Sequence, residues 1–209
     1  MKKILYGFIV VLAIGSEATV FCGNNEHKLK LPSPYKKPIL SDDRIIGYSM
    51  GIRPCRTSGI RLESELFKDK IIIHNYGHGG SGITLSWGSA QRVLEILDDE
   101  LVKTRSAIDQ PIAIIGAGVI GLSVAHELLD KGYKVSIYAK DFPPNVTASI
   151  GSGVIRSVGL GEGEDQGLLK KIHDISLERF KKYASEKNPD FNGVKYVADF
   201  KMIPGQSDI

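Results

Sequence analysis

The sequence predicts an α/β fold in which a parallel β-sheet is built around a crossover helix. Residues 112–138 have the pattern strand, glycine loop, helix, strand, which is typical of two parallel strands joined by a helix. A second glycine-rich loop, at residues 77–82, is also followed by a helical pattern. The chain has 209 residues, 42% hydrophobic and 24% charged, which is the size and composition of one moderate or two small globular domains.

Charge and glycine content narrow the kind of site to expect. The net charge is +3 and the basic residues are scattered, so the sequence does not predict a nucleic-acid partner. The 23 glycines cluster in residues 77–88, 116–121 and 151–163. Such clusters occur where the backbone turns tightly or approaches a ligand closely, which favours a site built from loops.

Residues 1–22 are predicted to be a signal peptide or an N-terminal anchor. Lys2 and Lys3 precede an apolar run at residues 4–14, and small residues follow at 16–18. This pattern is typical of a secretory signal, and the run is short for a membrane-spanning helix. We therefore expect a periplasmic or secreted protein, or one that an uncleaved N-terminal segment anchors to a membrane. A buried strand is the alternative.

The two cysteines leave two interpretations open. Cys22 and Cys55 are compatible with one disulfide in an oxidising compartment or with two unrelated thiols. A lipoprotein is disfavoured because Phe21 precedes Cys22 where a small residue is needed.

The region before the connector is predicted to contain short strands, a loop and a helix. Residues 23–44, rich in Lys, Pro and Asn, indicate an extended linker, and short apolar strands are expected within residues 45–73. A helix is predicted from residue 86 to residue 97, and residues 98–110 are predicted to be a polar connector. The expected buried face of the helix consists of Trp87, Ala90, Val93, Leu94 and Leu97.

The second half is predicted to be strand–helix–strand, followed by a long helix. Residues 112–115 form a wholly apolar strand, as expected where a parallel sheet is covered on both faces. Residues 122–129 are the crossover helix and residues 134–138 the second strand. A helix at residues 166–185 and a strand at residues 194–200 complete this half. The expected buried face of the long helix consists of Leu168, Leu169, Ile172, Ile175, Leu177 and Phe180.

The glycine loop between residues 115 and 122 has the spacing of a dinucleotide-binding motif. Its first glycine makes the tight turn, the second lets the backbone reach a pyrophosphate, and the third lets helix and strand pack closely. The pyrophosphate then lies at the N-terminus of the helix, where free N–H groups favour negative charge. Asp141 either reaches the ribose hydroxyls or is a solvated loop residue. The motif consists of Gly116, Ala117, Gly118, Val119, Ile120 and Gly121.

Two segments of the chain resemble the D-amino acid oxidase family. Residues 111–149 resemble the family's N-terminal FAD-binding segment. Residues 51–88, which include Arg53 and the stretch His-Asn-Tyr-Gly-His-Gly-Gly-Ser-Gly, resemble its C-terminal signature. The order of the two segments is reversed here. The resemblance implies a Rossmann-like FAD-binding domain, permuted, with residues 45–97 and 111–209 as its two parts and an incomplete substrate domain.

The resemblance also implies a role for particular residues. Arg53 would bind the substrate carboxylate through its guanidinium fork, and the carbonyl of Gly80 would lie near the substrate amine. Both loops would contact FAD. Besides the dinucleotide motif and Asp141, the implied cofactor contacts are Gly79, Gly80, Ser81, Gly82, Ile83, Thr84, Thr147, Ala148 and Ser149.

A metal site is not expected. His74 and His78 are four residues apart, but the glycines around them argue against the helix that would bring both rings to one ion. His78 as a hydrogen-bond partner that anchors the loop is the favoured interpretation.

The implied reaction is the oxidative deamination of an amino acid. Hydride passes from the α-carbon to the flavin, molecular oxygen reoxidises the flavin to give hydrogen peroxide, and water releases ammonia and a keto acid. The stereochemistry of the substrate and the oligomeric state stay open. Two alternatives are a noncatalytic FAD-binding fragment, or truncated inactive product, and an NAD-dependent dehydrogenase.

Overall fold

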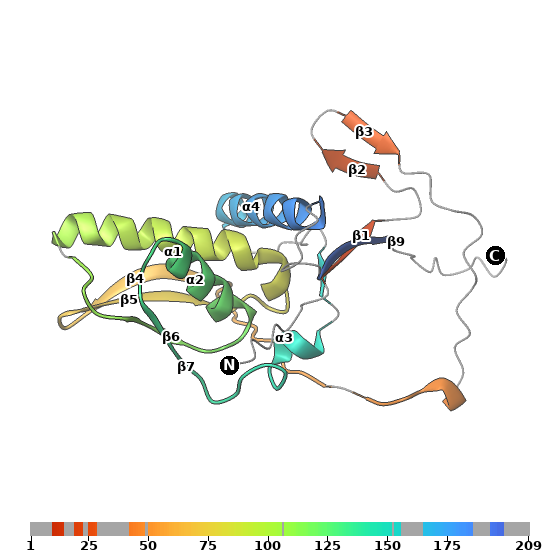
Figure 1. Ribbon diagram of the computed structural model, residues 1–209, viewed down its shortest axis with the longest axis horizontal. Helices are drawn as coiled ribbons and strands as arrows, with labels where there is room; N and C mark the ends of the chain where they lie inside the picture. Colours follow the sequence, from red (N-terminus) through yellow and green to blue (C-terminus); the bar gives the residue numbers. More distant parts are fainter. Residues whose placement is uncertain are drawn as a thin grey trace.

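The computed structural model describes residues 10–14, 19–22, 25–28, 42–48, 50–105, 107–151, 153–155, 165–185 and 193–198, and the statements below concern these residues. Side chains in residues 10–28, those of Arg44 and those after Val194 are outside this description. Figure 1 shows a mixed α/β arrangement in which three helices pack together beside short strands. The mixed α/β class predicted from the sequence is therefore confirmed.

Helix α1 (Gly82–Thr104) is the centre of the structure. It packs against α2 (Val119–Asp130), α4 (Gln166–Ser185) and the hairpin of β4 (Arg61–Phe67) and β5 (Lys70–Tyr76), as Figure 1 shows. Its buried residues recur at helical spacing, which is why these neighbours surround it. The buried hydrophobic residues of α1 are Leu85, Ala90, Val93, Leu94, Ile96 and Leu97.

Helix α1 is longer than the predicted helix at both ends. It begins at Gly82 and not at residue 86, and it ends at Thr104 and not at residue 97. The prediction that residues 98–104 belong to a connector is therefore wrong. The helix continues because Leu101 packs against the core, and it stops where Arg105 takes the left-handed conformation with φ 51°.

The β4–β5 hairpin confirms one of the strand predictions and corrects another. The two strands are antiparallel, from the pair Arg61–Tyr76 to the pair Phe67–Lys70. Residues 45–48 and 50, at the start of the range in which short strands are expected, have no strand structure. Their apolar side chains find no core to enter, since Ile46 and Met50 are almost fully exposed.

Strands β6 (Ile112–Ile115) and β7 (Val135–Tyr138) form the predicted parallel pair, joined by α2. The expected covering of both faces is wrong for the described residues. Ile114 is 7% exposed in the core, whereas its neighbour Ile115 points the other way and is 82% exposed. One face of the pair packs against the helices and the other carries apolar side chains in the open.

The remaining elements lie outside this core. Strand β1 (Val10–Ile14) pairs in parallel with β8 (Val154–Ile155) and β9 (Val194–Ala198), and β2 (Thr19–Cys22) pairs with β3 (Asn25–Lys28). Five residues of the N-terminal apolar run are thus in a strand, whose side chains lie outside the description, and export or anchoring stays a prediction. A short 3-10 helix (Asp42–Arg44) and α3 (Thr147–Ile150) complete the structure. Within the described part, no helix is both long and apolar enough to cross a bilayer.

Helices α1 and α4 touch through their backbones at Gly88. The Gly88 N–H donates a hydrogen bond of 2.8 Å to Ser176 Oγ, which itself donates one of 2.8 Å to the carbonyl of Ile172. A Cβ atom at residue 88 would lie 1.9 Å from that carbonyl oxygen. Ser176 is as buried as Ile172, because it bridges the two backbones. It was not part of the predicted buried face of α4.

We predict that Gly88→Ala destabilises the protein, although alanine is the better helix former by about 1 kcal/mol. The added methyl group forces α4 away from α1, and overpacking of this kind costs about 1–3 kcal/mol. The free energy of unfolding from urea denaturation is the measurement. Gln91→Ala, at an exposed position of the same helix, is the control and is expected to leave it almost unchanged. An increase in stability in Gly88→Ala would contradict the close contact.

Candidate cofactor and substrate site

A cavity of about 1360 Å³ brings the two glycine-rich segments together. One wall comes from the region around Arg53 and from the loop that leads into α1; the other comes from the loop that leads into α2 and from α3. Most of the residues to which the sequence analysis gave a role line this cavity. These are Arg53, Gly80, Gly82, Ile83, Thr84, Gly116, Ala117, Gly118, Val119, Ile120, Gly121, Asp141, Thr147 and Ala148.

The loop between β6 and α2 has the geometry that close approach of a phosphate requires. Gly116 has φ +109°, a conformation that favours glycine. A Cβ atom on Gly121 would lie 2.1 Å from the carbonyl oxygen of Gly116, so only glycine lets the helix pack on the loop. A Cβ atom on Gly118 would meet nothing within 4 Å. The space in front of Gly118, at the N-terminus of α2, is open to a ligand.

The loop between β5 and α1 faces the same cavity. Gly77, Gly79 and Gly80 have positive φ angles, which make the turn between strand and helix. A Cβ atom on Gly80 would lie 2.5 Å from Nη1 of Arg53, so the guanidinium lies directly against this loop. Arg53 is exposed, and its guanidinium has no hydrogen bond or ion pair with the described residues. The group is available to an anion.

The N-terminus of α1 contributes backbone donors to the cavity. The first N–H groups of a helix have no partner within it. Ile83 and Thr84 are in the first turn of α1. The first N–H of the helix that donates a hydrogen bond is that of Leu85, to the carbonyl of Ser81 at 3.0 Å. Both residues line the cavity. The positive end of the helix dipole therefore points into this space.

Direct contacts hold the two loops side by side. A Cβ atom on Gly82 would lie 3.5 Å from Cγ1 of Val119, and one on Gly51 would lie 3.0 Å from Cγ2 of Thr147. The hydroxyl of Thr84 donates a hydrogen bond of 3.5 Å to the carbonyl of Val154. Since each contact joins a residue before 85 to a residue after 118, the site is assembled by tertiary structure from segments far apart in the chain.

His78 anchors the loop, as predicted. Its Nε2 is hydrogen-bonded to Ser89 Oγ at 3.0 Å, and its carbonyl accepts the N–H of Ser81 at 2.8 Å. The ring is 4% exposed, and burial lowers the pKa of His78 from 6.5 to about 4. The imidazole is therefore neutral at pH 7.

The two histidines point to different partners. His74 Nε2 lies 3.0 Å from Glu65 Oε2. This hydrogen bond is the main cause of a lowered pKa of Glu65, and the hydrogen bond from Arg61 is the second cause. His78 bonds to Ser89, as described above. The pair therefore does not converge on one point, which is what a shared ion would need.

Some residues do not follow the sequence-based expectation. Gly79, Ser81 and Ser149 do not line the cavity, and Asp141 lines it but is exposed. Lys140 and Asn145 also line the cavity, although no role was predicted for them. In the sequence, only their position near Asp141 and Thr147 could have indicated this. Cys55 is a free, exposed thiol, which favours the interpretation of unrelated cysteines.

Comparisons with known proteins agree with this geometry. Residues 111–201 match the DAO family, FAD dependent oxidoreductase. The resemblance stated from the sequence is therefore confirmed over part of the chain, and FAD is the cofactor of this family. This favours FAD over NAD at the glycine loop. The reversed order of the segments and the extent of the substrate domain stay predictions.

Three similar proteins are oxidases of D-amino acids or of D-aspartate. A D-amino-acid oxidase of Dictyostelium discoideum is 49% identical over 61 residues, 28% of this chain and 17% of the relative. A D-amino acid oxidase of Dugesia ryukyuensis is 43% identical over 72 residues, 32% of this chain and 21% of the relative. A D-aspartate oxidase of Cryptococcus neoformans is 41% identical over 64 residues, 30% of this chain and 16% of the relative. The chain thus matches about a fifth or less of each of these relatives, and no solved structure matches it significantly.

We predict that His78 makes the stability of the protein depend on pH. The unfolded chain binds a proton near pH 6.5, whereas the folded one binds it only near pH 4. The stability due to the neutral ring is complete above pH 6.5 and is lost as the pH falls towards 4, by up to about 1.4 kcal/mol per pH unit.

Chemical denaturation between pH 6.5 and 5, above the range in which most carboxylates titrate, measures this slope. His78→Gln, which keeps a hydrogen-bonding group beside Ser89 but does not titrate, is expected to have a smaller slope than the wild type. Equal slopes in the two proteins would show that His78 is accessible to protons in the folded state.

Proposed function

We propose that the chain binds FAD in the cavity of about 1360 Å³ and forms the cofactor-binding part of an amino acid oxidase. The observation that carries this proposal is that one cavity is lined by both glycine loops and by Arg53. Neither loop alone would specify the reaction. A dinucleotide loop occurs in many oxidoreductases, and an exposed arginine is usually a surface cation.

The residues present fit a dinucleotide. The open space at Gly118 and the free N–H groups of the first turn of α2 suit the pyrophosphate. Thr147 and Ala148 of α3, together with Asp141, lie in the lining and would contact the rest of the nucleotide. The N-terminus of α1, at Ile83 and Thr84, would face the flavin ring, where a positive dipole favours negative charge.

Arg53 and Gly80 would position the substrate. The guanidinium of Arg53 can hold a carboxylate by two parallel hydrogen bonds. Because Arg53 lies against Gly80, that carboxylate would lie beside the glycine loop, whose carbonyl group would accept a hydrogen bond from the substrate amine. FAD held there would supply a two-electron acceptor that oxygen can reoxidise to give hydrogen peroxide. The amino acid would then be oxidised to an imino acid, which water hydrolyses to ammonia and a keto acid. The protein's part is to orient the substrate and to neutralise its charge.

A second candidate function is FAD binding without turnover. It is favoured by the exposure of Arg53, because an ion pair in water contributes only about 0–1 kcal/mol. Peroxide release by FAD-saturated protein, measured with a panel of D-amino acids, separates the two functions. Turnover supports the oxidase, and stable flavin binding without turnover supports the second candidate.

We predict that Gly118→Val prevents FAD binding without unfolding the chain. The side chain enters the space that the pyrophosphate needs, while its Cβ atom meets no protein atom within 4 Å. The measurements are flavin absorbance of the purified protein and circular dichroism. Gly47→Val, where a Cβ atom also meets nothing within 4 Å, is the matched control and is expected to bind FAD normally. A yellow Gly118→Val protein with the flavin content of the wild type would refute the assignment of the loop.

We predict that Arg53→Ala weakens substrate binding and leaves flavin content unchanged. Removal of a charge-assisted carboxylate pair costs on the order of 2–5 kcal/mol when the site excludes water, and less in an open site. The apparent substrate constant from peroxide release, and the change in flavin absorption on addition of amino acid, are the measurements. Lys131→Ala removes a cation outside the cavity and is the control. Loss of flavin in Arg53→Ala, with an unchanged response to amino acids, would exclude Arg53 from the substrate site.

A further inference from the structure

Helix α2 carries a group of possible metal ligands outside the cofactor cavity. His126, Glu127 and Asp130 offer one imidazole nitrogen and two carboxylates, and one ligand atom of each residue lies within 4.8 Å of those of the other two. None of the three is among the described residues that line the cavity at the glycine loops. The group is therefore separate from the proposed FAD site.

His126 and Asp130 have the spacing that brings two side chains to one point. Residues four apart on a helix lie on the same face, one turn apart. His126 Nδ1 lies 3.3 Å from Asp130 Oδ2 and 3.9 Å from Glu127 Oε1. In a tetrahedral zinc site, with bonds of about 2.0–2.2 Å, two ligand atoms are about 3.4 Å apart. The separation of the first pair is therefore already that of two ligands of one ion. The helical spacing that His74 and His78 lack is present here.

The imidazole nitrogen is held in place, whereas the carboxylate of Asp130 can move. Nδ1 of His126 is shielded from solvent, and the ring packs edge-on against Trp87 of α1, with the ring centroids 5.3 Å apart. Asp130 is the last residue of α2, and its side chain is 60% exposed. It can therefore rotate towards an ion without disturbing the core.

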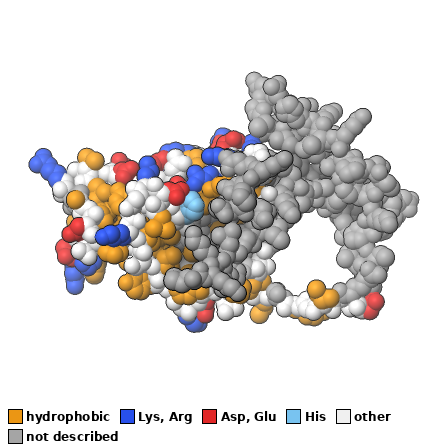
Figure 2. Space-filling view, in the orientation of Figure 1, with side chains coloured by type: hydrophobic (Ala, Val, Ile, Leu, Met, Phe, Trp, Pro, Cys, Tyr) orange, Lys and Arg blue, Asp and Glu red, His pale blue; other side chains and the backbone are white. Residues whose placement is uncertain are grey.

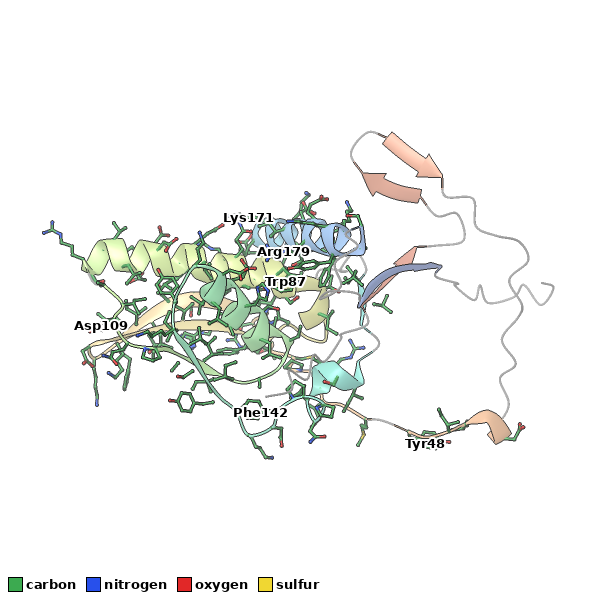
Figure 3. The ribbon with its side chains drawn as sticks, in the orientation of Figure 1. Tyr48, Trp87, Asp109, Phe142, Lys171 and Arg179 are labelled. Atoms are coloured by element: carbon green, nitrogen blue, oxygen red, sulfur yellow. The ribbon has the colours of Figure 1, made fainter. Side chains whose placement is uncertain are left out.

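Arg179 of α4 is the cation that competes for this group. Its Nη2 donates a hydrogen bond of 2.7 Å to Glu127 Oε1. The guanidinium has two further contacts: Nε donates a hydrogen bond of 2.9 Å to the hydroxyl of Tyr183, and Cζ lies 5.1 Å from the ring centroid of Trp87, as Figure 3 illustrates. Arg179 therefore stays anchored when Glu127 turns its second carboxylate oxygen towards an ion.

We propose that His126, Glu127 and Asp130 bind one divalent transition-metal ion, for which Zn²⁺ and Cu²⁺ are the probes. An imidazole nitrogen with carboxylate oxygens suits these ions, whereas Mg²⁺ and Ca²⁺ take oxygen ligands. Three protein ligands leave the fourth position to water. On the described part of the face in Figure 2, acidic and basic side chains are interspersed, so these three ligands and not a wider acidic patch would hold the ion.

The bound ion would stabilise the junction of three helices. Its ligands belong to α2, and two of them contact neighbouring helices: His126 touches Trp87 of α1, and Glu127 is bonded to Arg179 of α4. A ligand that binds the folded state in preference to the unfolded state stabilises the fold. The role of the ion is therefore structural and independent of FAD.

The test uses the full chain, in which Trp87 is the single tryptophan. Cu²⁺ is titrated while tryptophan fluorescence is recorded, and excess Zn²⁺, which does not quench, is then added as a competitor. Because the rings of Trp87 and His126 are in contact, we expect saturable quenching by one ion per chain and its reversal by Zn²⁺. Zn²⁺ alone is expected to raise the midpoint of urea unfolding. Saturation of the protein with FAD is expected to leave both results unchanged.

Variants of the ligands make the test specific. His126→Gln removes the nitrogen ligand, and Asp130→Asn removes a charge at an exposed position where misfolding is not expected. Both are expected to bind at least about tenfold more weakly, since even the loss of an outer-shell partner costs about 10–100-fold in metal affinity. His173→Gln is the matched control: His173 Nδ1 also lies near a carboxylate, 3.4 Å from Asp174 Oδ1, but outside the group. It is expected to bind like the wild type.

Circular dichroism establishes that each variant is folded before the titration. Undiminished quenching in either ligand variant, equal loss of binding in His173→Gln, or failure of Zn²⁺ to compete would each overturn the proposal. In those cases the group is only a hydrogen-bonded pair of His126 and Asp130 at the end of α2. Neither oxidase activity nor flavin content enters the measurement, so its outcome is distinguishable from that of the proposed function.

Discussion

The burial of helix α1 is the constraint on which the rest of the structure depends. The helix has apolar residues on several sides, so β4–β5, α2 and α4 all have to pack against it. The contact with α4 leaves no space for a side chain at Gly88, and Ser176 replaces packing there with a hydrogen bond. Figure 3 shows Trp87 of α1 near Arg179 of α4; the guanidinium carbon lies 5.1 Å from the ring centroid.

The position of α1 also decides where the site is. Because α1 and α2 pack together, their N-termini lie beside each other, as the contact of Gly82 with Val119 and Ile120 shows. Each N-terminus follows a glycine loop and each presents free N–H groups. Two positive helix ends facing one cavity favour an anionic ligand, and FAD carries its negative charge on the pyrophosphate and, when reduced, on the flavin. The site is therefore built mainly from backbone, with Arg53 as the charged side chain at its rim.

A neutral histidine and several charged side chains lie around this cavity. The buried His78 is uncharged at pH 7 and holds the loop by a hydrogen bond to Ser89, so it adds no charge to the lining of the cavity. The ion pairs of Arg61 with Glu63 and Glu65, and the hydrogen bond between His74 and Glu65, lie on the hairpin β4–β5, partly exposed to solvent. Exposed ion pairs contribute little to stability, so the hairpin depends on the packing of Leu62 and Ile73 against the hydrophobic core beside α1.

The sequence by itself determined the local elements and the chemistry of the loops. The bounds of β6 and α4 and the parallel pair with its crossover helix follow from hydrophobic periodicity, and the glycine spacing of residues 116–121 predicted the turn into α2. These features depend on neighbours within a few residues, which the sequence displays directly.

Only the tertiary structure decided the extent of α1, the exposure of Ile115 and the burial of Ser176. Each depends on which elements pack together: Leu101 extends α1 because a core lies beneath it, and Ile115 is exposed because no layer covers the second face of β6 among the described residues. The meeting of Arg53 with Gly80, and of residues 51–84 with residues 116–154, is likewise a long-range contact. Periodicity carries no information on such contacts, because they are set by the packing of whole helices and strands.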